Sequence, residues 1–588
     1  MQNNTGIFNM LKKLKKLQNP FERYVFPLLL VLWPLVPLRQ GVSVMDTTYS
    51  LANYRYPQGA GMMWSIATFL ANLTGRAFMA LPVGKTMAGM NLLCLLLISL
   101  TALLCYRVLG RMIPGWMIFC GEFLAAAFCW CPAVILYNYL TYLLLTLGTL
   151  FLFLAVSSVP EKKRYYILAG ACLGLNVTVR FSNLTQAALI LALWFWCACA
   201  GKSFSAVAKR TLFCISGYAA GFGAGYLLCA AMYGPAAYWQ MIPQLFSATG
   251  NVQSYTAAGM LLSTLDAYGH TLRWFLILVP CMIMGAVFFA MPLLRSKKRL
   301  KRLLYIAGIM VIVRFYYSRG MFNLNYQDYG SMFEWGMMLV ILTLILCIIG
   351  MAGAYGANPD ERFLSAAVFV TILILPLGSN NYTYPVLNCM FITAPYALWM
   401  LRRIWQETRH TETHFSWHAM TVMILCMALI QGSLFHIFFA FRDGTDGTRR
   451  SAVIQMLPAA AGMHTTPANA QELEDLWQYL QSENLTGTPA IVFGSAPGIH
   501  YLMELPPALD SAWPDLDSYP AEQFKEQLRK QKKDSLPLII LHEENSPQSA
   551  SSDEKCGELF DFMRDNAYQQ AYTGGAYSVY TAAGKAQE

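Results

Sequence analysis

The stretch TMAGMNLLCLLLISLTALLCY (86–106) decides the fold class, because its 21 residues include no charged side chain. A helix of about 20 apolar residues is long enough to cross the hydrocarbon core of a membrane. Similar runs recur along much of the 588-residue chain, which is 56% hydrophobic. Only 13% of its residues are charged, against roughly a quarter in soluble proteins. The pattern predicts an α-helical polytopic membrane protein.

Hydropathy predicts about thirteen transmembrane helices. Basic residues occur mainly in alternate short gaps between them, so the net charge of +10 follows the positive-inside rule rather than indicating nucleic-acid binding. The basic N-terminus should be cytoplasmic, and the first span should be a retained anchor because no signal-peptidase-like site follows it. The expected spans are 24–38, 86–106, 114–133, 139–158, 165–182, 184–200, 212–232, 274–294, 303–317, 332–354, 364–378, 391–405 and 418–440.

The composition becomes polar beyond residue 441, which divides the chain into a membrane part (1–441) and a C-terminal domain (442–588). Helical patterns such as AQELEDLWQYLQ (470–481) alternate there with strand patterns such as PAIVFG (489–494), so a small α/β domain with its own core is expected. The odd number of spans places this domain outside the cytoplasm. Only Cys556 of the 15 cysteines lies in it, which excludes a disulfide framework there.

The long first outer loop (39–85) contains GVSVMDTTYSLANYRYPQG (41–59), in which Asp46 is the only carboxylate. A carboxylate at the membrane surface can serve as a general base, but Asp46 also fits the N-cap of a helix that begins near Thr47. The second half of the loop (62–81) has apolar residues at helical spacing. It is expected either to lie flat in the membrane interface or to form an ordinary packed helix.

Several basic residues stand at the outer ends of spans, where they either reach to the surface or hold a phosphate. The candidates for phosphate binding are Arg180, Arg314, Arg319 and Lys85. The outer gaps are also rich in tyrosine and asparagine, residues that suit sugars as well as the membrane interface. No H-E-x-x-H, CxxC pair, P-loop or DxD motif occurs, and GSAPG (494–498) is either a plain turn or an anion-binding nest.

This layout resembles the GT-C superfamily of membrane glycosyltransferases, which includes protein O-mannosyltransferases and aminoarabinose transferases. The matching parts are Asp46 in the first outer loop, the amphipathic 62–81 segment, the many spans and the C-terminal domain. The resemblance implies a polyprenyl-phosphate-linked sugar donor and a catalytic role for Asp46. Several relatives carry a second acid after the third span, where this chain has Asn138, so a metal bridge between two acids is not expected. Arginines would then have to neutralise the charge of the donor phosphate.

We therefore expect an inverting glycosyltransferase of the cell membrane that transfers a sugar to a glycan, lipid or protein of the cell envelope. No cofactor and no nucleic-acid partner are expected, and the sequence leaves a divalent metal open. A transporter or flippase of lipid-linked glycans, and an O-antigen-type polymerase or ligase, are the alternatives. The expected substrate-binding residues are Tyr49, Asn53, Tyr54, Asn138, Tyr139, Asp328, Asn380 and Asn381.

Overall fold

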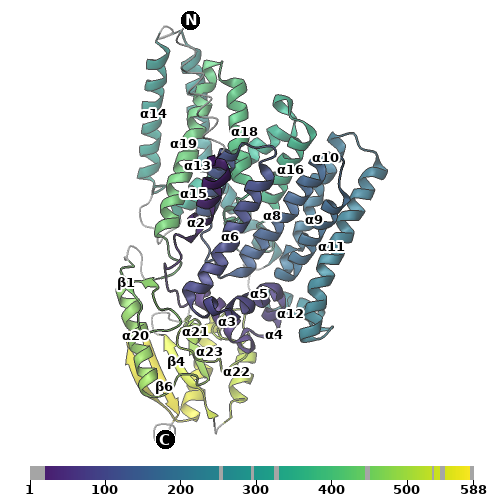
Figure 1. The fold of residues 1–588 in the computed structure, drawn as a ribbon. Helices are drawn as coiled ribbons and strands as arrows, with labels where there is room; N and C mark the ends of the chain where they lie inside the picture. Colours follow the sequence, from purple (N-terminus) through teal and green to yellow (C-terminus); the bar gives the residue numbers. More distant parts are fainter. Residues whose placement is uncertain are drawn as a thin grey trace.

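The computed structural model describes residues 20–250, 256–292, 297–322, 330–379, 381–443, 450–532, 535–542 and 550–582. It consists of a bundle of helices and a smaller α/β domain packed against one end of that bundle (Figure 1). The chain therefore has the fold class that its sequence predicts, a helical membrane protein with a C-terminal α/β domain.

Each predicted span coincides with a helical segment. Seven helices in the described part are long and apolar enough to cross a membrane, while the other predicted spans are shorter or less apolar. The helical segments are η1 (Phe21–Val25), α2 (Phe26–Leu32), η2 (Trp33–Leu35), α6 (Met87–Leu109), α7 (Gly115–Ala127), α8 (Leu136–Ser157), α9 (Lys163–Val179), η5 (Phe181–Leu189), α10 (Ile190–Cys199), α11 (Phe204–Tyr233), α13 (Ala257–Ala290), α14 (Lys298–Ser318), α15 (Gly330–Met351), α16 (Pro359–Ile374), α18 (Thr393–Thr408) and α19 (Phe415–Phe438).

Glycines bring α9 and α11 into close contact. A Cβ atom at Gly170 would lie 2.0 Å from the Cys214 carbonyl oxygen, and one at Gly221 would lie 2.1 Å from the Ala171 carbonyl oxygen. Small residues allow helix backbones to approach in this way inside a membrane. The glycines of α11 therefore serve close packing, which fixes α9 and the residues at its end.

Short helices lie across the end of the bundle that faces the C-terminal domain (Figure 1). The amphipathic 62–81 segment forms two of them, which are separated at Thr68. It is a packed segment, since a Cβ atom at Gly75 would touch the ring of Tyr54 at 2.6 Å. These elements are α3 (Asp46–Arg55), η3 (Pro57–Ala60), α4 (Met62–Ala67), α5 (Phe69–Ala80), η4 (Pro82–Lys85), α12 (Ala237–Gly250) and α17 (Tyr384–Asn388).

The C-terminal domain contains a four-stranded sheet of order β3-β4-β6-β5, in which β3 and β4 are parallel and the other pairs are antiparallel. The predicted helices and strands are present, but the closing hairpin of β5 and β6 was not predicted. The elements are β1 (Ala452–Val453), β2 (His464–Thr465), α20 (Pro467–Ser482), β3 (Ala490–Phe493), α21 (Ile499–Leu502), α22 (Ala521–Arg529), β4 (Leu538–His542), α23 (Ala550–Asp565), β5 (Tyr568–Gly574) and β6 (Tyr577–Ala582).

The domain does not have a wholly separate core. One hydrophobic cluster, which includes Phe493, Phe524 and Leu559, belongs to the domain alone. A second cluster joins Val492 and Leu473 of the domain to Leu51 of the first outer loop and Met90 of α6. The domain therefore has a core of its own, as expected, and in addition shares a second core with the membrane part.

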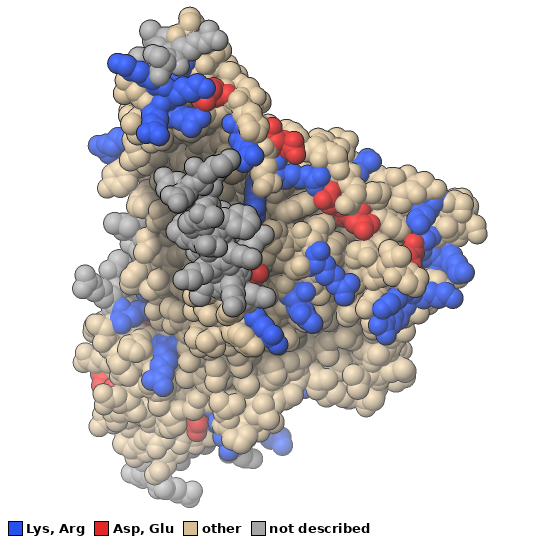
Figure 2. Space-filling view, turned by 45° about the horizontal axis from the view of Figure 1, so that its top comes forward, with Lys and Arg blue, Asp and Glu red and all other residues tan. Residues whose placement is uncertain are grey.

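Basic side chains gather at the end of the bundle away from the C-terminal domain, as Figure 2 shows from that side. Several of them form ion pairs with acids from neighbouring connections. Arg210 pairs with Glu161 at 2.8 Å, and Arg403 pairs with Glu361 at 2.7 Å. The arrangement has the charge asymmetry that the positive-inside rule describes, with the basic end opposite the domain.

Candidate functional site

Asp46 is the first residue of α3, at the end of the bundle that contacts the C-terminal domain. The N-cap position belongs to Met45, and no side chain makes a capping hydrogen bond there. The structure therefore does not contain the N-cap that the motif DTTYS suggested for Asp46. A carboxylate in the first turn still benefits from the positive end of the helix dipole.

Burial raises the pKa of the Asp46 carboxyl above its usual value, and the guanidinium of Arg442 opposes part of that rise. Arg442 also contacts the residue before Asp46, since its Nη1 lies 3.3 Å from the Met45 sulfur. Arg442 was not predicted as a site residue. It is almost 400 residues from Asp46 in the sequence, and no motif connects the two. A half-buried carboxyl with a raised pKa is a property expected of a general base.

Arg180 stands at the end of α9, directly before η5. Its Nη2 donates to the Gly378 carbonyl at 3.2 Å, and its guanidinium carbon lies 5.5 Å from the centre of the Tyr137 ring. The Cys131 thiol is within electrostatic range of both Arg180 and Asp46. The structure thus brings a carboxylate and a guanidinium into the neighbourhood of the same short loop, although they are 134 positions apart (180 minus 46).

A buried network of amides fixes the turn that carries Arg180. Asn183 donates to the Thr141 hydroxyl at 2.6 Å, and Asn176 donates to the Gln186 carbonyl oxygen at 2.7 Å. These side chains are buried, so their hydrogen bonds are costly to lose. The network holds η5 against α8 and thereby fixes the place of Arg180.

The loop between α7 and α8 is held by side chains that the sequence suggested for substrate binding. The Tyr54 hydroxyl donates to the Val134 carbonyl at 2.8 Å, and the Tyr139 hydroxyl donates to the Cys131 carbonyl. Asn138 donates to the Cys131 sulfur at 3.2 Å. All three side chains are buried and support the loop. Asn388, which was not predicted, accepts hydrogen bonds from the Trp130 and Cys131 amides at 3.0 and 3.2 Å.

Tyr49 and Asn53 lie one turn apart on α3 and interact through their side chains. The Tyr49 ring meets the ring of Trp513 edge-on, with 5.2 Å between centroids. The Oδ1 atom of Asn53 is buried without a hydrogen-bond partner among the described residues. This face of α3 therefore lies at the contact with the C-terminal domain.

The remaining candidates are exposed or lie outside the described residues. Arg314 and Arg319 are exposed on α14, and each guanidinium stands over an aromatic ring of its own helix, at 5.6 and 5.5 Å. Lys85 is exposed at the end of η4, and Asn381 is exposed beyond α16. No contact within the described ranges joins Arg314, Arg319 or Lys85 to Asp46. Asp328 and Asn380 lie outside the described residues.

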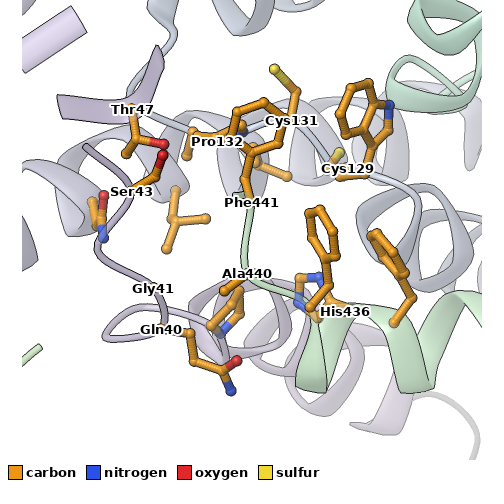
Figure 3. A pocket seen from close by; sticks show the side chains of 18 of the residues that line it. Gln40, Gly41, Ser43, Thr47, Cys129, Cys131, Pro132, His436, Ala440 and Phe441 are labelled. Atoms are coloured by element: carbon orange, nitrogen blue, oxygen red, sulfur yellow. The ribbon is translucent and has the colours of Figure 1, made fainter. Parts of the chain in front are cut away.

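A pocket opens beside the first turn of α3. Ser43 and Thr47 line one side of it and Cys129 and Cys131 another, with Phe441 between them (Figure 3). The other lining residues include Gln40, Asn91, Trp130, His436 and Ala440. The pocket thus combines hydroxyl and amide groups with aromatic rings, a combination that suits a sugar. Asp46 stands between two of its lining residues in the sequence.

The donor set around Asp46 does not fit a divalent metal held by several carboxylates. In the described part of the chain, no three His, Cys, Asp or Glu side chains gather in a way that could hold a metal ion. The nearby loop contributes Asn138 and Cys131, and a hard cation prefers several charged oxygen ligands. No chemical step is therefore assigned to a metal.

No protein-family model matches this sequence, and no curated protein matches it. Among solved structures, the chain is similar to the Archaeoglobus fulgidus oligosaccharyltransferase in complex with zinc and sulfate, with a TM-score of 0.46 and 10% identity over 88% of this chain and 68% of that one. The A. fulgidus oligosaccharyltransferase AglB, in complex with an inhibitory peptide and a dolichol-phosphate, gives a TM-score of 0.42 and 12% identity over 96% and 75%.

ArnT from Cupriavidus metallidurans, bound to undecaprenyl phosphate, is also similar, with a TM-score of 0.36 and 10% identity. That match covers 97% of this chain and 98% of ArnT. All three matches have TM-scores below 0.5 and identities of at most 12%.

Replacing Arg442 with glutamine is expected to move the acidic limb of the pH–activity profile to higher pH. The Arg442 charge lowers the pKa of Asp46, so its removal raises that pKa further and leaves more of the carboxyl protonated at a given pH. The measurement is the rate of sugar transfer against pH for both proteins. An unchanged profile would show that Arg442 does not influence the protonation of Asp46. The matched control is Arg314→Gln, which alters an exposed arginine elsewhere.

Proposed function

We propose that this chain is an inverting glycosyltransferase that moves a sugar from a polyprenyl-phosphate carrier to a cell-envelope acceptor. The main support is that Arg180 and the helix that begins at Asp46 meet at residues 134–137, at the end of the bundle away from the basic side chains. The Arg180 guanidinium stands over the Tyr137 ring, and Tyr54 of that helix donates to the Val134 carbonyl. By the positive-inside rule this end is extracytoplasmic, and so is the C-terminal domain. The acceptor is a glycan, lipid or protein on that side.

In the proposed reaction, the oxygen of an acceptor hydroxyl attacks the anomeric carbon of the donor sugar. The new carbon–oxygen bond forms as the bond from that carbon to the phosphate oxygen breaks. Asp46 takes the hydroxyl proton, and a positioned general base of this kind contributes about 10²–10⁴-fold in rate. The carrier leaves as a lipid phosphate, and the displacement inverts the anomeric centre.

Arg180 is proposed to hold the phosphate of the donor. A guanidinium presents several N–H donors in a fixed plane, which matches two phosphate oxygens at once. One of its nitrogens already donates to Gly378, which fixes the plane of the group. The negative charge that grows on the leaving phosphate would then meet a preorganised cation. Arg314, Arg319 and Lys85 are less well suited to this role, since they are exposed.

The decisive experiment is native mass spectrometry of the protein purified from its own membranes, followed by a transfer assay with the lipids that co-purify. A bound polyprenyl-phosphate sugar and a product enlarged by one sugar would support the proposal. Lipid-linked glycan that crosses the membrane unchanged would indicate a flippase. Joined glycan chains would indicate a polymerase or ligase.

A further inference from the structure

We propose that the C-terminal domain positions Asp46, and that Gly498 in the GSAPG turn is the positioning residue that fixes the first turn of α3. The catalytic consequence rests on the function proposed above, whereas the structural part stands by itself. The argument starts from the backbone of residues 39–45, which connect the first span to α3.

The backbone of this connection is bound by the C-terminal domain rather than by the bundle. The Gly41 amide donates to the His464 carbonyl at 2.9 Å, and the His464 amide donates to the Arg39 carbonyl at 2.7 Å. The Val42 amide donates to the Asp443 carboxylate at 3.1 Å, and Asn469 donates to the Val42 carbonyl at 2.9 Å. Apart from the single bridge at Gln40, residues 40–45 belong to no helix or strand of their own. The domain therefore supplies the partners that buried backbone groups require.

The buried carboxylate of Asp443 ties these contacts together. Besides the Val42 amide, it accepts hydrogen bonds from the Thr465 hydroxyl at 2.6 Å and from the Asn469 amide at 2.9 Å. A buried charge that accepts several hydrogen bonds is costly to displace. The start of the connection is thus fixed where the domain begins.

Gly498 fixes the last part of the connection, next to Asp46. Its amide donates to the Val44 carbonyl at 2.8 Å. A Cβ atom at this position would lie 1.6 Å from the Thr48 hydroxyl oxygen and 2.7 Å from the Val44 carbonyl oxygen. The GSAPG turn therefore touches the residues on both sides of Asp46, and only a glycine leaves room for that contact.

Three further contacts hold the rest of α3 and its end against the domain. The Tyr49 ring meets Trp513 edge-on, Arg55 pairs with Glu504 at 2.9 Å, and the Ala512 amide donates to the Gly59 carbonyl at 2.7 Å. These contacts come from separate parts of the domain, so they resist both rotation and displacement of α3. The placement of Asp46 consequently depends on Asp443 and on contacts from residues 464–513.

The substitution Gly498→Ala tests this inference. Gly498 has φ −67° and ψ −16°, a conformation that alanine adopts freely, so the change leaves the turn itself unstrained. The three atoms nearest to the added methyl group belong to Thr48, in the first turn of α3, and to Val44 before it. We expect hydrogen–deuterium exchange of residues 41–49 in the full-length protein to rise about tenfold or more, because the contact that orders them opens. Binding of added undecaprenyl phosphate, followed by native mass spectrometry, should be unchanged.

Two companion variants make the result specific. Gly557→Ala adds a methyl group to the same domain where nothing lies within 4 Å, so its exchange should match the wild type. In the double variant Gly498→Ala with Thr48→Gly, the atom nearest to the new methyl group is gone, while the Val44 carbonyl oxygen at 2.7 Å remains. Protection of residues 41–49 should therefore recover in part, measured against Thr48→Gly, which also lacks the hydrogen bond from Thr48 to the Ser43 carbonyl. Thr48→Gly alone sets the baseline for the double variant.

The effect on catalysis is tested by comparing the kinetics of Gly498→Ala and the wild type, with the lipid extract on which the wild type transfers sugar as the donor. A base displaced by about 1 Å costs about 10²-fold in rate, so Gly498→Ala should lower kcat strongly while the KM for the donor stays within about twofold. Exchange in Gly498→Ala equal to that in Gly557→Ala would overturn the positioning role. If exchange rises and no variant or wild-type protein transfers sugar, the positioning of the loop stands and the proposed function fails.

Discussion

Replacing Asp46 with asparagine is expected to lower turnover by about 10²-fold or more while folding and donor binding persist. Asparagine keeps the size of the side chain but cannot accept the proton of the acceptor hydroxyl. A capping role would predict almost no effect, because asparagine caps helices about as well as aspartate, and α3 has no side-chain cap for the substitution to disturb. The measurement is sugar transfer by purified, monodisperse protein with a lipid-linked donor.

The matched control is Asp475→Asn, which removes an equal charge from an exposed position on α20. That variant should transfer sugar at the wild-type rate. Activity close to wild type in Asp46→Asn would remove the catalytic assignment and leave Asp46 as a residue of the loop only.

Replacing Arg180 with alanine is expected to raise the KM for the donor by about 10- to 100-fold, the effect of losing hydrogen bonds to a charged group. Arg180→Lys should restore only part of the affinity, because an ammonium group cannot reproduce two parallel hydrogen bonds. The measurement is the initial rate against donor concentration at a saturating acceptor concentration. Both substitutions also remove the hydrogen bond from the Arg180 guanidinium to the Gly378 carbonyl. Circular dichroism and thermal unfolding should therefore be measured for each variant, to show that it folds as the wild type does.

Arg314→Ala and Arg319→Ala provide the comparison for Arg180. Arg314 on α14 and Arg319 directly after its last residue are both exposed, so we expect the donor KM to stay within about twofold in each variant. A large increase in either variant would extend the phosphate site to α14, whereas an unchanged KM in Arg180→Ala would return Arg180 to a purely structural role.

The helices were predictable because their signal is local. A run such as 86–106 is apolar over its whole length, and α6 covers almost the same residues. The α20 and β3 segments of the domain were predictable for the same reason. The β5–β6 hairpin was missed because YQQAYTGGAYSVYTA (568–582) has no clear apolar alternation on its outer strand, and β5 indeed has largely exposed side chains.

The site was less predictable because its geometry is not local. Asp46 and Arg180 could be singled out as charges at the ends of spans, but nothing in the sequence pairs either of them with Arg442 or Asn388. Tyr54 and Tyr139 have the composition of sugar-binding residues, yet their hydroxyls are used by backbone carbonyls. Gly498 was considered only as part of a turn, because the helix that it touches lies 450 positions away (498 minus 48).

The dependence of the first outer loop on Asp443 and Gly498 has a consequence for biosynthesis. The Val42 amide finds its acceptor 401 residues further along the chain, so the ribosome makes the loop long before it makes the partners of that loop. The bundle can enter the membrane during that interval, but residues 40–45 still lack acceptors and donors for their backbone. Transfer would then begin only after the domain has been synthesised and folded. If the proposed function holds, lipid-linked sugar would not be used by chains whose C-terminal domain is still incomplete, and completion of that domain would be the step that activates the protein.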